Sequence, residues 1–144
     1  AQPADYPERL ESGTLSVPLI CGLGSGIDFI KSKGITVIYN HEMKIINYIY
    51  SRLAQEKRFE VYTENLYKNN YAPVLSFNVK GKNSDEVADF LNKNGIAVRA
   101  GLHCAPTAHK KIGTLETGTV RISPSVFNSL YDSEHLIKVL KMFK

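Results

Sequence analysis

A histidine and a cysteine stand side by side within residues 95–106, which read GIAVRAGLHCAP. The thiol of Cys104 is a candidate nucleophile, His103 is a candidate base, and Arg99 brings a positive charge into the same stretch. Positive charge beside a thiol favours the thiolate, which is the reactive form. A glycine and a proline bracket the pair, which indicates a turn. Because cysteine is also often buried as a small apolar residue, a structural role for Cys104 stays open at this point.

Two short alternating segments each carry an arginine on their polar side. In residues 96–99 and in residues 119–123, the isoleucine and valine side chains share one face of the expected strand. If these apolar side chains face the core, then Arg99 and Arg121 face away from it. Two arginines placed in this way could bind one anion together. Either arginine alone could equally be an ordinary surface cation.

Composition limits the protein class. The chain has 144 residues, of which 43% are apolar and 22% are charged, as expected for one globular domain with a hydrophobic core. The net charge of +4 comes from scattered lysines, so we expect no nucleic-acid partner. No apolar run approaches the roughly 20 residues that cross a bilayer, and the first residues lack a signal-peptide pattern, so we expect no membrane partner.

The two cysteines lie far apart and form no C-x-x-C pair. We therefore expect neither a metal site nor a disulfide, and we expect reduced thiols in a cytoplasmic protein. Cys21 falls in an apolar stripe at helical spacing, so its expected role is packing.

Apolar periodicity and turn residues predict alternating helices and short strands. Expected helices cover residues 17–33 and 36–56, with a third capped by Ser84 and a fourth capped by Asp132. The expected strands are residues 59–62, 74–79, 96–99 and 119–123. This order predicts an α+β fold with a small sheet and helices packed on one face.

Three motifs, in order, give the chain a family resemblance. They are residues 9–14 (RLESGT), 95–105 (GIAVRAGLHCA) and 118–123 (GTVRIS). Over most of its length the chain resembles the C-terminal part of class V aminotransferase-fold enzymes that use pyridoxal phosphate, in the cysteine desulfurase and selenocysteine lyase group. The resemblance implies an interdomain segment at residues 1–15 and a C-terminal small domain, as in fold-type I enzymes, at residues 16–144.

The resemblance also implies roles for the candidate residues. Cys104 would be the catalytic nucleophile that takes sulfur from L-cysteine as a persulfide and leaves alanine. Arg121 would bind the substrate carboxylate with help from Arg99. His103 would act in catalysis only through a local effect on the thiol.

A second part of the resemblance concerns the cofactor. Thr14, together with Gly13, is expected to reach the phosphate of the cofactor in the partner subunit, which implies a homodimer. The cofactor lysine of the family lies upstream of the RLESGT motif, so we expect the large domain to be absent from this chain. Lys110 only superficially resembles that lysine and is expected to be exposed among turn residues. We therefore expect this fragment to be inactive and to bind no pyridoxal phosphate tightly by itself.

Two other readings stay open. The chain could be a stand-alone sulfur carrier whose Cys104 receives a persulfide from another protein. It could also belong to an enzyme of the same fold that acts on another amino acid by elimination or transamination. Within the desulfurase reading, the substrate is L-cysteine or L-selenocysteine, and the implied further partner is a sulfur-acceptor protein.

Overall fold

The computed structural model describes residues 3–11, 13–63 and 71–143, and the chain divides into two compact units, Ala1–Val37 and Ile38–Lys144. The first unit contains a short 3-10 helix, Glu8–Leu10, and the helix α1, Val17–Lys33. The bounds of α1 agree with the sequence prediction, and the helix ends at Gly34, whose φ of 85° suits glycine. No residue of α1 is buried. The apolar stripe therefore predicted the helix correctly, although none of its side chains is buried.

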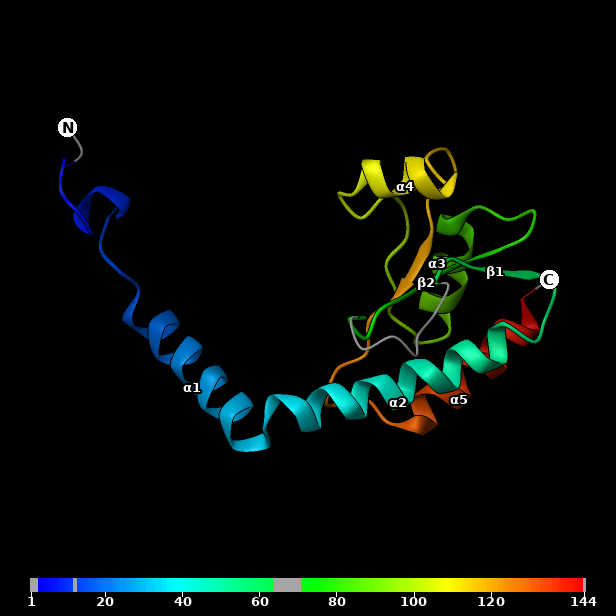
Figure 1. Cartoon of the computed structure of the whole chain (residues 1–144), viewed down its shortest axis with the longest axis horizontal. Coiled ribbons are helices and arrows are strands. Elements are labelled where there is room, and N and C mark those ends of the chain that lie inside the picture. Colours follow the sequence, from blue (N-terminus) through cyan, green and yellow to red (C-terminus); the bar gives the residue numbers. More distant parts are fainter. Residues whose placement is uncertain (1–2, 12, 64–70, 144) are drawn as a thin grey trace. The chain divides into compact units, whose positions relative to one another are not determined.

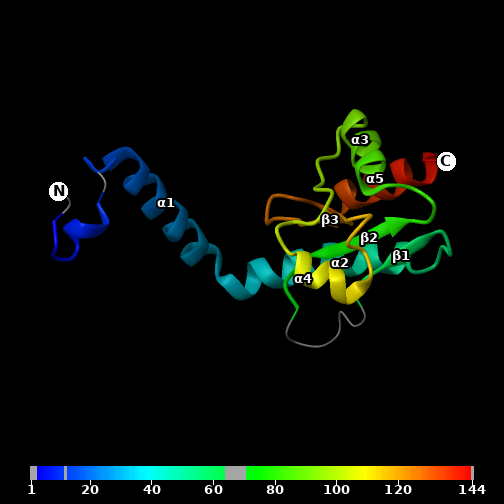
Figure 2. The same cartoon turned by 90° about the horizontal axis from the view of Figure 1, so that it is seen from above.

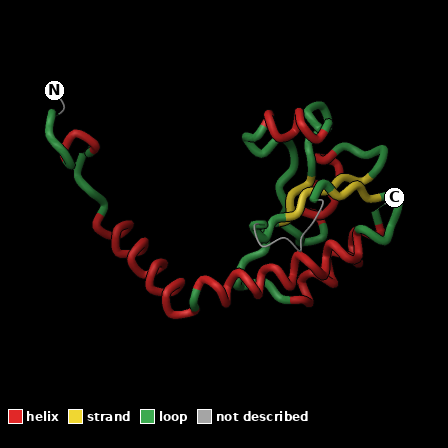
Figure 3. Tube along the Cα trace, in the orientation of Figure 1, coloured by secondary structure: helices red, strands yellow, loops and turns green. Residues whose placement is uncertain are grey.

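The described residues of the second unit form three strands, the helices α3, α4 and α5, and most of α2 (Figure 1). The strands are β1 (Phe59–Val61), β2 (Leu75–Val79) and β3 (Val120–Ile122), and they form an antiparallel sheet in the order β1-β2-β3. The helices are α2 (Ile35–Leu53), α3 (Ser84–Lys93), α4 (Pro106–Ile112) and α5 (Leu130–Met142). Figure 3 shows the strands as a short central patch among longer helices.

The register of the sheet places its apolar side chains on one face. Leu75 pairs with Ile122 and Phe77 pairs with Val120, and all four are buried. Between these pairs, Ser76 faces Arg121, so the arginine of β3 lies on the opposite face, as its alternation with apolar residues predicted. The sheet therefore has one apolar face and one polar face.

Three helices cover the apolar face. The core joins the sheet to buried residues of α2, to Val87 and Leu91 of α3, and to the apolar residues of α5. Burial of each such side chain contributes about 1.5–3 kcal/mol. Buried residues of α2 recur at helical spacing, namely Met43, Ile45, Ile46, Ile49 and Leu53. The α+β class, with a small sheet and its core helices on one face, is confirmed.

The helix α4 was not expected from the sequence. In Figure 1 it lies above the strands while α2 and α5 lie below them. Figure 2, turned by 90°, again shows α4 and the pair α3 and α5 on opposite sides of the strands. The sequence signal was weak because the helix has only seven residues and begins at Pro106, a residue that more often marks a turn.

Two helix caps differ from the prediction by a few residues. Asn83, and not Ser84, is the N-cap of α3, because its side chain accepts the N–H of Asp85 at 3.0 Å. Ser129 is the N-cap of α5, and Asp132 completes a capping box by accepting the N–H of Ser129 at 2.7 Å. This contact with Ser129 lowers the pKa of Asp132 below its ordinary value. Among the described residues, no helix has the length and hydropathy needed to cross a membrane.

Candidate functional site

Cys104 lies in a tight turn between Leu102 and Ala105. The N–H of Ala105 donates to the carbonyl of Leu102 at 2.8 Å, and the two central residues, His103 and Cys104, have φ angles of 51° and 59°. Two positive φ angles in succession are the mark of a type I′ turn, which usually selects glycine or asparagine. For residues with larger side chains this backbone costs about 1–2 kcal/mol each. The turn must therefore be held by contacts with its surroundings.

The first of these contacts is strand pairing at the free edge of β3. Arg99 and Arg121 exchange two backbone hydrogen bonds, of 3.2 and 2.7 Å, and Gly101 and Thr119 exchange two more, both of 3.1 Å. Residues 99–101 thus continue the sheet beyond β3. The pairing fixes the residue that enters the turn, Gly101, and brings the two arginines directly opposite each other.

The strand predicted over residues 96–99 is shorter than expected. Only Arg99 forms a bridge, whereas the N–H of Ile96 donates to the carbonyl of Leu91 at the end of α3. Ile96 and Val98 still pack against the core, so their predicted facing is correct. At the start of residues 96–99, a hydrogen bond to the end of α3 takes the place of strand pairing.

The second support is a close backbone crossing at Gly118. A Cβ atom on Gly118 would lie 2.7 Å from the Cα atom of Gly101, and the φ angle of Gly118 is 61°. Asn78 of β2 donates from Nδ2 to the carbonyl of Gly118 at 2.9 Å. Asn78 is only 6% exposed, although it faces away from its core neighbours in β2, Phe77 and Val79. The buried side-chain amide of Asn78 thus holds Gly118 in its close approach to Gly101.

The sulfur of Cys104 lies beside a guanidinium group. Cys104 is exposed, and Nη2 of Arg99 lies 3.8 Å from its Sγ atom. The guanidinium group is a cation and a hydrogen-bond donor, so this contact can hold the sulfur in place. Because Cys104 is exposed, the structure excludes the role of a buried packing residue that the residue type alone left open.

The two arginines border an open depression on the polar face of the sheet. It has a volume of about 210 Å³ and is lined by Ala97, Val98, Arg99, Arg121 and Ser123. Within the described residues neither arginine forms a salt bridge, and Nε of Arg121 is buried without a hydrogen-bond partner. In this part of the structure, two guanidinium groups without an acidic partner form a receptor suited to a carboxylate or another small anion.

His103 points back toward the sheet. Its Nε2 atom lies 3.0 Å from the carbonyl oxygen of Thr119 and 3.2 Å from Oγ1 of the same residue. Burial lowers the pKa of His103 below its ordinary value, and the positive charges of Arg121 and Arg99 act in the same direction. The hydrogen bond to Thr119 opposes this shift but does not outweigh it. The surroundings therefore favour the neutral imidazole.

Sequence reasoning missed several supporting residues. Thr119 and Asn78 support the turn through hydrogen bonds, and Thr119 is only 1% exposed. The sequence gives no sign of this role, because both are polar residues within short expected strands. His109 was expected among turn and surface residues. It lies instead in α4, is 4% exposed and bonds Thr114 through Nδ1 at 2.7 Å. Lys110, the next residue, is exposed as predicted.

The remaining site candidates lie in the first unit. Gly13 and Thr14 are exposed there, and their expected role toward a cofactor stays a prediction. Cys21 is exposed on α1, so the expectation that it packs in an apolar stripe is wrong for this chain. The segment predicted to join domains, residues 1–15, contains the 3-10 helix and three residues whose structure is not described.

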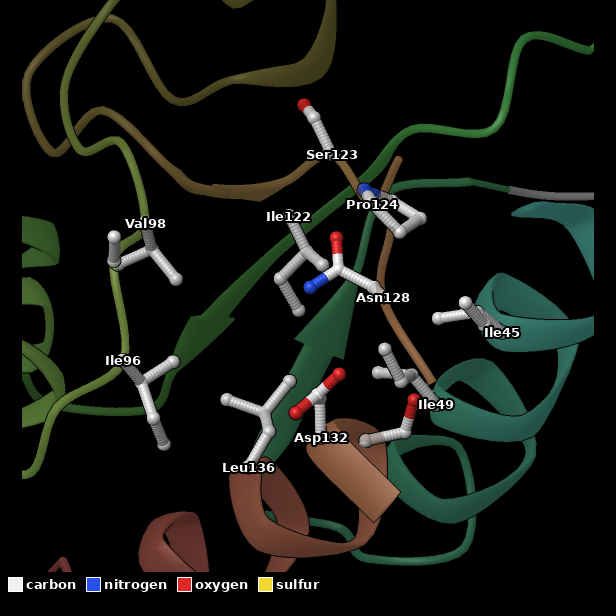
Figure 4. Close-up of a pocket in the computed structure, with 12 residues that line it drawn as sticks. Ile45, Ile49, Ile96, Val98, Ile122, Ser123, Pro124, Asn128, Asp132 and Leu136 are labelled. Carbon is white, nitrogen blue, oxygen red and sulfur yellow. The ribbon is translucent and has the colours of Figure 1, made fainter. Parts of the chain in front are cut away.

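A second cavity, of about 100 Å³, lies on the apolar side of the same edge. Figure 4 shows it between Ile96, Val98, Ile122 and Leu136, with the Asp132 carboxylate at its rim. It shares Ala97, Val98 and Ser123 with the arginine depression but contains none of the candidate site residues. In the described part of the chain, no three histidine, cysteine or acidic residues lie close enough to hold a metal ion.

The chain is similar in sequence to proteins named as probable cysteine desulfurases. A probable cysteine desulfurase of Staphylococcus epidermidis is 33% identical over 141 residues, which are 98% of this chain and 33% of that protein. One of Methanothermobacter thermautotrophicus is 34% identical over 139 residues, 95% of this chain and 34% of that protein. The chain thus spans about a third of the length of these curated relatives.

Solved structures lead to the same group of proteins. The apo cysteine desulfurase from Thermococcus onnurineus NA1 superimposes with a TM-score of 0.84 at 37% identity, covering 94% of this chain and 33% of that one. The family model for class V aminotransferases matches residues 1–136. With its motifs, its fold and its relatives in agreement, the chain belongs to the class V aminotransferase family.

Proposed function

We propose that this chain is the C-terminal domain of a pyridoxal-phosphate-dependent cysteine desulfurase, in which Cys104 takes sulfur from L-cysteine as a persulfide and alanine is released. One observation carries the proposal. The exposed sulfur of Cys104 lies 3.8 Å from the Arg99 guanidinium, and Arg99 is paired directly across from Arg121. A nucleophilic sulfur and a carboxylate receptor thus share one edge of the sheet, as an amino-acid substrate that gives up sulfur would require.

The described residues divide the work between them. Arg121, with its unpaired buried Nε, would hold the substrate carboxylate over the depression. Arg99 would hold the Cys104 thiolate near the substrate sulfur. The thiolate attacks that sulfur, a new S–S bond forms and the C–S bond of cysteine breaks. The carbon keeps the electron pair, takes up a proton and becomes the methyl group of alanine, so no external oxidant is needed.

Breaking the C–S bond in this direction requires an electron sink, which pyridoxal phosphate supplies in the enzymes of this family. The residues described here do not form a site for that cofactor by themselves. Lys110 and Lys111 are exposed on α4, and the two residues expected near the phosphate, Gly13 and Thr14, are exposed in the other unit. We therefore expect this chain alone, mixed with cysteine and the cofactor, to form no alanine.

A chimera tests the proposal. Residues of this chain replace the matching third of the Thermococcus onnurineus desulfurase, which supplies the rest of the enzyme. With L-cysteine, the chimera should release alanine and carry 32 Da of added sulfur on the Cys104 peptide. Cys104→Ser should abolish both signals while the absorbance of bound cofactor persists. Cys21→Ser, the matched control, should leave both unchanged. Alanine release from the Cys104→Ser chimera would overturn the assignment.

The exposure of Cys104 in this chain alone favours one further candidate, a sulfur carrier that needs no cofactor. A carrier would accept sulfane sulfur from a separate, sulfur-loaded desulfurase. Mass spectrometry of the mixture would then find added sulfur on Cys104 of the unfused chain. Loading of the chimera but not of the unfused chain would select the enzyme domain over the carrier.

A further inference from the structure

The hydrogen bonds of His103 define which of its ring nitrogens carries the proton. Nε2 lies 3.0 Å from the carbonyl oxygen of Thr119, and a carbonyl oxygen only accepts. Nε2 must therefore be the N–H donor. In the neutral ring, Nδ1 then has a lone pair and no proton.

Nδ1 is badly placed to act as a base. It is buried and has no hydrogen-bond partner, so the Cys104 thiol is not within hydrogen-bonding reach of it. Protonation of Nδ1 would add a positive charge near Arg99, Arg121 and His109 with no acceptor to receive the new N–H. A group that takes a proton from a thiol needs to contact that thiol, and this nitrogen does not.

Nε2, in contrast, is well placed to hold the turn. The carbonyl oxygen of Thr119 accepts both the side chain of His103 and the backbone N–H of Gly101, at 3.0 and 3.1 Å. The carbonyl oxygen of the buried Thr119 thus holds both Gly101, which enters the turn, and His103, the first central residue of the turn. Cys104 follows directly and has the second positive φ angle. Without this attachment, the backbone is free to relax toward negative φ and carry Sγ away from Arg99.

From this arrangement we infer that His103 is a positioning residue for Cys104: its Nε2–H group, held by Thr119, fixes the left-handed turn that places the sulfur beside Arg99. The inference deepens the proposed function, because it concerns the sulfur that would accept the substrate atom. Its test needs neither cofactor nor cysteine.

The test uses three substitutions of His103 in the 144-residue chain with Cys21→Ser, so that Cys104 is its single thiol. His103→Gln keeps an N–H donor near the position of Nε2, His103→Asn has its donor near the position of Nδ1, and His103→Ala has none. The readout is the rate of alkylation of Cys104 by iodoacetamide at pH 7.5. We expect His103→Gln to react within about twofold of the parent, while His103→Asn and His103→Ala react roughly fivefold more slowly because the sulfur loses its contact with Arg99.

Two results would overturn the inference. If His103→Gln is as slow as His103→Ala, a titrating imidazole is required and His103 acts as a base. If all three variants react like the parent, the turn needs no attachment at His103.

Folding is checked by circular dichroism. Should the alanine variant unfold, the comparison of Gln with Asn decides alone, because both are polar and differ in the position of the donor. Thr119→Ser should preserve the rate, since it keeps the carbonyl and the hydroxyl. A chimera that forms no persulfide would count against the proposed function and leave these alkylation rates unchanged.

Discussion

The chain exposes two cysteines in very different settings, and the two regions are best understood together. Cys21 lies on α1, a regular helix without a buried residue. Cys104 lies in a turn with two positive φ angles, supported by Thr119, Gly118 and Asn78 beneath it. Both thiols reach solvent, so exposure does not distinguish them. The difference is that every support of Cys104 is a specific contact, while the backbone around Cys21 is held by its own helix.

This contrast explains how strain is tolerated at one point of the molecule. The hydrogen bonds of a helix are local, so α1 needs little from other elements to present a thiol. The turn needs a paired strand edge, a glycine crossing and a buried amide to maintain a conformation that its sequence disfavours. These three supports indicate that the fold fixes the position of the Cys104 sulfur and does not merely expose it.

The largest predicted effect is at the glycine crossing. Gly118→Ala places a methyl group 2.7 Å from the Cα atom of Gly101 on a backbone with φ of 61°. Because the obstacle is backbone, it cannot rotate away, and we expect a loss of about 2–4 kcal/mol in the free energy of unfolding. Urea unfolding followed by circular dichroism measures it. A loss below about 0.5 kcal/mol would mean that the crossing is loose.

Gly22→Ala in α1 is the matched control for that glycine. A Cβ at Gly22 meets nothing within 4 Å, and alanine favours a helix over glycine by about 1 kcal/mol. Helicity should stay the same or rise. If both substitutions destabilise the protein equally, the contrast between the two regions fails.

The next effect in size is at the amide beneath the turn. Asn78→Ala removes the Nδ2–H donor to Gly118 and leaves a buried carbonyl without that partner. We expect a loss of about 1–2 kcal/mol in the free energy of unfolding, again measured with urea. Ser25 on α1 provides the comparison, because its hydroxyl group donates a hydrogen bond to the carbonyl of Cys21 and this bond is exposed to solvent. Ser25→Ala should change stability by less than about 0.5 kcal/mol, and an equal cost at both sites would contradict the prediction.

Local patterns predicted much of this molecule. Alternation in residues 119–123 correctly placed Arg121 on the polar face, and helical spacing gave the bounds of α1. Both signals are short-range, because each depends on a period of two or 3.6 residues within one element. The GLHC turn was also identified, since glycine and proline flank it.

The supports of the turn were out of reach for the same reason. Contact between Thr119 and His103 spans sixteen positions, and the bond from Asn78 to Gly118 spans forty. Neither side chain carries a local sign of its partner, because strand pairing fixes which residues meet. Alternation along β2 separates Asn78 from Phe77 and Val79 but gives no sign that Asn78 is itself buried.

A smaller effect tests the charge beside Cys104. Arg99→Leu removes the guanidinium 3.8 Å from Sγ but keeps the backbone pairing with Arg121. We expect Cys104 to be alkylated about two- to fivefold more slowly, since an exposed charge pair is worth about 0.2–1 kcal/mol. Peptide mass spectrometry follows Cys21 in the same molecule as an internal control. Arg99→Lys should restore part of the rate, and an equal slowing of both thiols would contradict a local effect.

The smallest effect is the pH dependence that His103 contributes to stability. Burial, with Arg121 and Arg99 nearby, lowers its pKa in the folded state below the ordinary 6.5, so the unfolded chain binds the proton more readily. Stability should therefore fall as the pH drops from about 7 toward 5. His103→Gln should remove part of this slope. The difference between parent and variant in urea unfolding at pH 7.5, 6.5 and 5.5 isolates the contribution of His103. Parallel curves would show that protonation of His103 leaves the turn intact, and would weaken the contrast between this turn and the regular helix α1.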